Sequence, residues 1–130
     1  MISVELARRL LSAGLVWEPQ AGDRFVVPDR GMNDEVFYIS ELTVDVHQFP
    51  TGRVVAFNGT TEWAMDSVEL TDALWLPGES RLREELGDRF DSLRRDGDDW
   101  LVVLGPDLRE FRHPDAESAY ALALLDVLDF

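Results

Sequence analysis

The sequence predicts an α+β fold in a single domain over residues 1–130, with antiparallel β meanders packed against three helices. Its length of 130 residues is that of one ordinary domain. A hydrophobic content of 45% with four tryptophans is sufficient for a buried core. The predicted elements run in the order helix–strands–helix–strands–helix, which is typical of α+β proteins with antiparallel pairing.

The chain begins with a predicted helix. Ser3 is placed to cap it, because a serine side chain accepts a hydrogen bond from a free backbone amide of the first turn. Apolar residues then recur at helical spacing, and Gly14 suits the end of the helix. Residues 25–27 predict a short strand that ends at Pro28, and the polar residues 29–35 predict a loop.

Three further strands are predicted before residue 58. Residues 36–39 are strand-like, and residues 42–47 alternate strictly between apolar and polar, as on a half-buried strand. A turn at residues 50–52 then predicts a hairpin into a strand over residues 53–57.

The segment around Asn58-Gly59 has two interpretations. Asn-Gly is a favoured two-residue hairpin dipeptide, so residues 60–65 are predicted to form the next antiparallel strand. The alternative is a ligand-binding loop, in which the amide and hydroxyls orient a polar ligand against an aromatic wall. The residues of that candidate site are Asn58, Thr60, Thr61, Glu62 and Trp63.

Asp45 and His47 are a second candidate ligand-binding pair. They are two residues apart on a predicted strand, so they share the face opposite the core. That geometry suits acid–base chemistry or a metal ion, and a metal would need a third ligand from elsewhere, such as Glu41 or Glu62. A solvated Asp/His pair on the wet face of a sheet is the alternative.

Residues 70–76 predict a short helical turn before Pro77. Within it, Trp75 and Leu76 are predicted to be exposed at an interface with a partner or with a second copy. The reason is that an apolar run beside a thinly apolar surface helix is hard to bury completely.

The C-terminal half is predicted to alternate helix, strands and helix. The expected elements are a helix over 79–86, strands over 90–95, 98–104 and 108–112, and a final helix capped by Asp115. Asp96-Gly97 is the strongest hairpin signal in the chain. The final helix has a wide apolar face, and we expect it to be the main helix packed against the sheet.

Composition excludes several chemistries. The chain has no cysteine and no lysine, so disulfides, thiolate nucleophiles, Schiff bases and a standard phosphate-binding-loop lysine are excluded. A net charge of −14 argues against direct nucleic-acid binding. The apolar runs are too short to cross a bilayer, so no membrane insertion is expected. No metal and no cofactor are predicted.

Several blocks of the sequence resemble a family of small actinobacterial proteins that often carry the automatic label "pilus assembly protein". These blocks are Gly22–Arg30, Phe57–Ala64, Leu74–Pro77, Pro114–Glu117 and Ala119-Tyr120, and they extend over most of the chain. The resemblance implies no assigned activity and no assigned site residues. A basic set made of arginine alone fits the high-GC genome that such an origin implies.

We therefore expect a soluble cytoplasmic protein that binds or assists others through protein–protein or small-ligand contacts, without catalytic residues of its own. Its partner would be another protein or a second copy of the chain. One alternative is a small carboxylate- and histidine-dependent hydrolase that uses Asp45, His47 and Glu62. Another is an acidic inhibitor that imitates nucleic acid.

Overall fold

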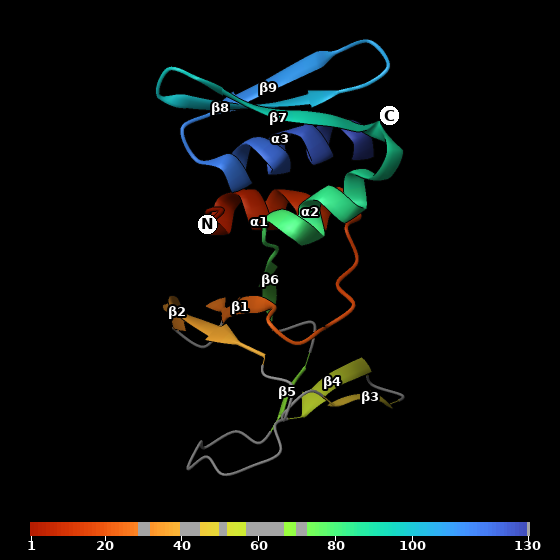
Figure 1. Ribbon diagram of the computed structural model, residues 1–130. Helices are drawn as coiled ribbons and strands as arrows, with labels where there is room; N and C mark the ends of the chain where they lie inside the picture. Colours follow the sequence, from red (N-terminus) through yellow and green to blue (C-terminus); the bar gives the residue numbers. More distant parts are fainter. Residues whose placement is uncertain (29–31, 40–44, 50–51, 57–66, 70–72, 130) are drawn as a thin grey trace. The chain divides into compact units, whose positions relative to one another are not determined.

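The computed structural model describes residues 1–28, 32–39, 45–49, 52–56, 67–69 and 73–129, with only the backbone of residues 32–34, 45–49, 52–56 and 67–69 (Figure 1). The predicted α+β class and the order helix–strands–helix–strands–helix are confirmed. Contacts group the chain into two compact units, of Met1–Val16 with Pro77–Phe130 and of Trp17–Leu76. Each unit is described by itself, and the single domain over residues 1–130 stays a prediction.

The first unit is built from three helices and one antiparallel sheet. Its elements are α1 (Val4–Ser12), α2 (Glu79–Leu86), the short 3-10 helix η2 (Gly87–Arg89), β7 (Phe90–Asp96), β8 (Asp99–Leu104), β9 (Arg109–His113) and α3 (Ala116–Leu128). The strands follow the order β7-β8-β9. Helix α3 lies against β8 and β9, and α1 and α2 pack on its other side (Figure 1). The prediction that the final helix is the main one on the sheet is confirmed.

Local signals in the sequence explain where these elements begin and end. The Ser3 hydroxyl accepts a hydrogen bond from the amide of Leu6 at 3.1 Å, which caps α1. Asp115 caps α3 in the same way, by accepting from the amide of Ser118 at 3.0 Å. Gly97 adopts a φ of 60° at the turn between β7 and β8, a conformation that glycine reaches without steric cost. The predicted caps and the Asp96-Gly97 hairpin are therefore confirmed.

Helix α3 is buried more completely than the sequence pattern predicted. Ala119, Tyr120, Ala123 and Leu124 on the predicted apolar face are buried, but so are two residues beside it, Ser118 at 4% and Ala121 at 0% exposed. A helix with a sheet on one side and helices on the other has no wide solvent-facing stripe.

The described residues of the second unit form two three-stranded antiparallel sheets. One has the order β2-β1-β6 and the other β3-β4-β5. Their strands are β1 (Arg24–Val27), β2 (Met32–Tyr38), β3 (Asp45–Phe49), β4 (Gly52–Ala56), β5 (Ser67–Glu69) and β6 (Leu74–Leu76). The predicted strand over 25–27 and the predicted hairpin around residues 50–52 are confirmed.

Two boundary predictions in this unit are wrong. The predicted loop over residues 29–35 is too long, because β2 already begins at Met32, which pairs with Val27 after a register shift. The predicted helical turn over residues 70–76 is replaced by β6 at its C-terminal end. Trp75 pairs there with Phe25 of β1, so a distant strand determines the local conformation.

The predicted hairpin loop at Asn58-Gly59 and the predicted strand over 60–65 fall within residues 57–66, which lie outside the described residues. At the end of β4, Ala56 pairs with Ser67 of β5 on one side and with Asp45 of β3 on the other.

The described core of the second unit is aromatic. Trp17 stacks on Trp75 with ring centroids 6.1 Å apart, and it packs against Phe25 at 5.6 Å. The indole Nε1 of Trp17 donates a hydrogen bond to the buried carboxylate of Asp23 at 2.8 Å. The carboxylate also accepts from the amide of Gln20. The Trp17 indole and the Asp23 carboxylate are thus hydrogen-bonded although they are buried, as the burial of polar groups requires.

No helix among the residues described has both the length and the apolar character needed to traverse a bilayer.

Burial of Leu82 in the first unit generates a stability prediction. Leu82 is 0% exposed, so Leu82→Ala removes packed methyl groups and leaves a cavity. We expect the free energy of unfolding to fall by about 2–5 kcal/mol, measured by urea denaturation. Leu11→Ala is the matched control, because Leu11 is also helical but 59% exposed. Its effect should stay within about 0.5 kcal/mol, and equal losses in the two variants would contradict the described packing.

Candidate functional site

The predicted ligand loop lies outside the described residues. Asn58, Thr60, Thr61, Glu62 and Trp63 all fall within residues 57–66. Its role as a ligand-binding loop stays a prediction.

Asp45 and His47 lie on β3, as predicted. In the ladder with β4, Asp45 is opposite Ala56 and His47 is opposite Val54. Positions two apart on a strand share a face, so the backbone brings this pair to one face of the sheet. Their side chains lie outside the description, and so does Glu62.

The prediction that Trp75 and Leu76 are exposed is wrong. Trp75 is 6% exposed and Leu76 2% exposed. Both belong to β6, which pairs with β1, and Trp75 also stacks on Trp17. The apolar run is therefore core of the second unit, so its side chains are not offered to a partner.

A groove in the first unit lies between α1 and the C-terminal end of α3. It has a volume of about 510 Å³, within the size range of ligand sites. Its lining combines charged and apolar side chains: Glu5, Arg8, Arg9, Ser12, Ala13, Leu125, Leu128 and Asp129. We call it the arginine groove. Its α1 residues recur at helical spacing, so they form one exposed stripe of that helix.

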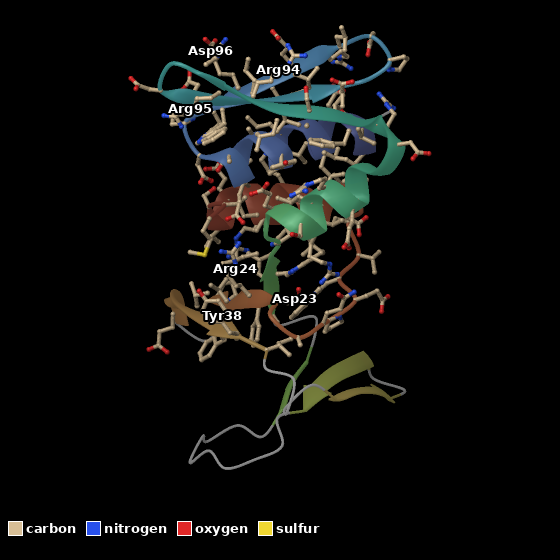
Figure 2. The ribbon with its side chains drawn as sticks, viewed as in Figure 1. Asp23, Arg24, Tyr38, Arg94, Arg95 and Asp96 are labelled. Atoms are coloured by element: carbon tan, nitrogen blue, oxygen red, sulfur yellow. The ribbon has the colours of Figure 1, made fainter. Side chains whose placement is uncertain are left out.

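Arg8 and Arg9 differ from the other arginines of the first unit. Both are exposed, and neither side chain makes a hydrogen bond or an ion pair to another described residue. Every other arginine of this unit has a side-chain contact with the protein. Four of them form ion pairs with carboxylates. Arg89 donates to a carbonyl, Arg94 to a hydroxyl and Arg95 to a carbonyl, and Arg95 also lies over an indole ring. Figure 2 shows Arg94 and Arg95 on β7. The α1 pair is thus available to an external anion.

Sequence patterns alone did not single out Arg8 and Arg9. In the sequence they are two charges in an amphipathic helix. The available signal is an adjacent arginine pair on the polar face of a helix in a chain of net charge −14. This pair can be distinguished from the other arginines of the unit only when the contacts of those arginines are known.

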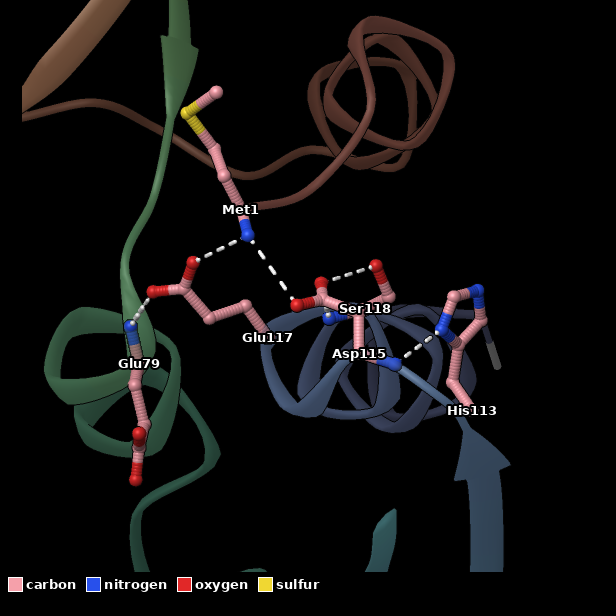
Figure 3. A network of polar contacts seen from close by, with 6 residues as sticks. All are labelled: Met1, Glu79, His113, Asp115, Glu117 and Ser118. Atoms are coloured by element: carbon pink, nitrogen blue, oxygen red, sulfur yellow. Dashed lines mark hydrogen bonds and ion pairs between the residues drawn. The ribbon is translucent and has the colours of Figure 1, made fainter. Parts of the chain in front are cut away.

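A polar network surrounds the N-terminus of α3 (Figure 3). The ammonium of Met1 lies 3.1 Å from Glu117 and 3.3 Å from Asp115. Glu117 also accepts a hydrogen bond from the amide of Glu79 at 2.8 Å, and the amide of Asp115 donates to Nδ1 of His113 at 2.9 Å. The contacts of Asp115 and Glu117 with Met1 and Glu79 join the starts of α2 and α3 to Met1, so they stabilise the first unit.

These contacts change the ionisation of the groups involved. Partial burial acts to lower the pKa of the Met1 ammonium, but hydrogen bonds to Glu117 and Asp115 raise it above its ordinary value of 8.0. Partial burial acts to raise the pKa of Asp115, but hydrogen bonds from Ser118 and the Met1 ammonium lower it below 3.8. Both groups are charged at neutral pH.

Within the described part of the chain, no three histidine or carboxylate side chains gather in a way that would hold a metal ion. Comparisons with protein-family models, curated proteins and solved structures found no match to this chain. The resemblance to small actinobacterial proteins therefore stays a prediction.

The charge of Asp115 should stabilise the fold in a pH-dependent way. Asp115→Asn keeps a capping oxygen but removes the charge, whereas Asp115→Ala removes the cap as well and should cost about 1 kcal/mol. Because the folded-state pKa lies below 3.8, the charge contributes above that value and its contribution is lost as the pH falls through the folded-state pKa.

Urea unfolding of the native protein and of Asp115→Asn, at neutral pH and below pH 3.8, measures this effect. The stability difference should shrink on acidification. Asp107→Asn is the control, since Asp107 is exposed. A difference that is the same at both pH values would contradict the role given to the charge.

Proposed function

We propose that this protein is a cytoplasmic accessory protein that acts by binding another protein, without catalysis of its own. The observation that supports this proposal is the arginine groove, where two exposed guanidinium groups have no partner among the described residues. Arginine is enriched at protein interfaces because its planar group forms several directed hydrogen bonds at once.

Charge limits the kind of partner. A chain of net charge −14 repels the phosphates of nucleic acids at long range. The arginine pair acts at short range, where neither guanidinium forms an ion pair with a described carboxylate, although Glu5 and Asp129 also line the groove. We therefore propose that the arginine pair binds a local anionic group on another protein and that the chain does not bind nucleic acid directly.

A second candidate function is hydrolysis that uses Asp45 and His47. The observation in its favour is their placement on one face of β3, two residues apart. Activity against chromogenic ester and phosphate monoester substrates, lost in both His47→Gln and Asp45→Asn, would support it. Activity that is unchanged in these variants would exclude this pair.

The accessory function is tested by affinity capture from a lysate of the source organism. The matched baits are the native protein, the double variant Arg8→Gln/Arg9→Gln, and the double variant Arg94→Gln/Arg95→Gln. The Arg94→Gln/Arg95→Gln variant is the control, because it also removes two adjacent exposed arginines. Unlike the α1 pair, these two contact Ser92, Gly97 and Trp100.

We expect the native protein and the control variant to capture the same partner in stoichiometric amounts. The α1 variant should lose affinity by about tenfold or more, which corresponds to about 1.4 kcal/mol. Circular dichroism checks that all three proteins are folded. A native protein that remains monomeric in sedimentation and captures nothing would contradict the proposed function.

A further inference from the structure

The arginine groove also indicates what it would recognise. Resting on the accessory function proposed above, we propose that the groove binds a short extended segment of a partner protein in which a carboxylate side chain lies beside an aliphatic one. The two guanidinium groups without an ion pair, the apolar part of the lining and the length of the α1 stripe each support this ligand.

The carboxylate follows from the two guanidinium groups. A guanidinium pairs with a carboxylate through two parallel N–H···O hydrogen bonds, and such charge-assisted bonds are stronger than neutral ones. Arg109 already makes this contact inside the first unit, with distances of 2.6 and 2.8 Å to the two carboxylate oxygens of Asp126. Arg8 and Arg9 have the same group without a described carboxylate.

The aliphatic neighbour follows from the rest of the lining. Leu125 and Leu128, from the last turns of α3, are only half-buried and line the groove together with Ala13. Covering apolar surface of this kind contributes about 25 cal/mol per Å². An aliphatic side chain next to the carboxylate would therefore use both parts of the lining.

The dimensions favour a polypeptide segment. The α1 stripe runs from Glu5 to Ser12, which is about 10 Å at 1.5 Å per residue and matches about three residues of extended chain. Glu5 and Asp129 also line the groove, so a densely anionic ligand would meet like charges there. A segment with one or two carboxylates meets less of this repulsion than a polyanion does.

Selection from a random peptide library displayed on phage tests the proposal, with the full-length native protein as bait. The same library is selected in parallel on Arg8→Gln/Arg9→Gln and on Arg94→Gln/Arg95→Gln. Enriched peptides are synthesised, and their affinity for the three proteins is measured by fluorescence anisotropy. Decanoate, inorganic phosphate and untagged native protein serve as competitors.

We expect the enriched peptides to share an acidic residue adjacent to leucine, isoleucine or valine. Their affinity should fall at least tenfold for the α1 variant and stay within twofold for the β7 variant. Enrichment of basic peptides, equal affinity for all three proteins, or no enrichment would overturn the proposal. So would stronger competition by decanoate, by phosphate or by a second copy of the chain than by unlabelled peptide.

Failure of this inference is distinguishable from failure of the accessory function. If affinity capture yields a partner whose binding does not depend on the arginine pair, the accessory function stands and the ligand assigned to the groove is wrong. If the peptides bind through the pair but no partner is captured, the groove is assigned correctly and the accessory function is wrong.

Discussion

The first unit depends on burying α3 from two sides. The helix lies between the β7-β8-β9 sheet and the helices α1 and α2, so it needs apolar or small residues nearly all round. Its alanines meet this need, since Ala119, Ala121 and Ala123 are each 0% exposed. Small side chains let neighbouring elements approach closely, while Tyr120 and Leu124 fill the remaining volume. The other helices of the unit need only one apolar face because each packs against α3.

This central position determines where the polar groups of the unit gather. Three kinds of positive or hydrogen-bond-donating groups meet at the start of α3 (Figure 3). They are the Met1 ammonium, the first amide of α2 and an amide in the first turn of α3 itself. Glu117 serves two of them, because it pairs with the ammonium and accepts from the first amide of α2. A carboxylate in the first turn also interacts favourably with the dipole of its own helix. One acidic turn thus satisfies groups from three parts of the chain.

Apart from the fold class and the packing of α3 on the sheet, the features that sequence reasoning predicted correctly depend on near neighbours. The Ser3 cap and the Gly97 turn each depend on residues within a few positions along the chain. The strand at Trp75 could not be predicted in this way, because its conformation follows from pairing with Phe25, fifty residues earlier. The second buried side of α3 likewise requires knowing that α1 and α2 pack against it. Arg8 and Arg9 became a candidate site only when the other arginines of the unit were seen to have partners.

The chain leaves the first unit after Val16 and returns to it at Pro77, so that unit is assembled from two separate segments. The ion pair between Met1 and Asp115 joins residues that are 114 positions apart. Contacts of such long sequence separation form late, because a long loop must close before they contribute. During synthesis α1 therefore emerges well before the helix it packs against. The arginine groove cannot form before α3 has also been synthesised, and its ability to bind would report that the two segments have met.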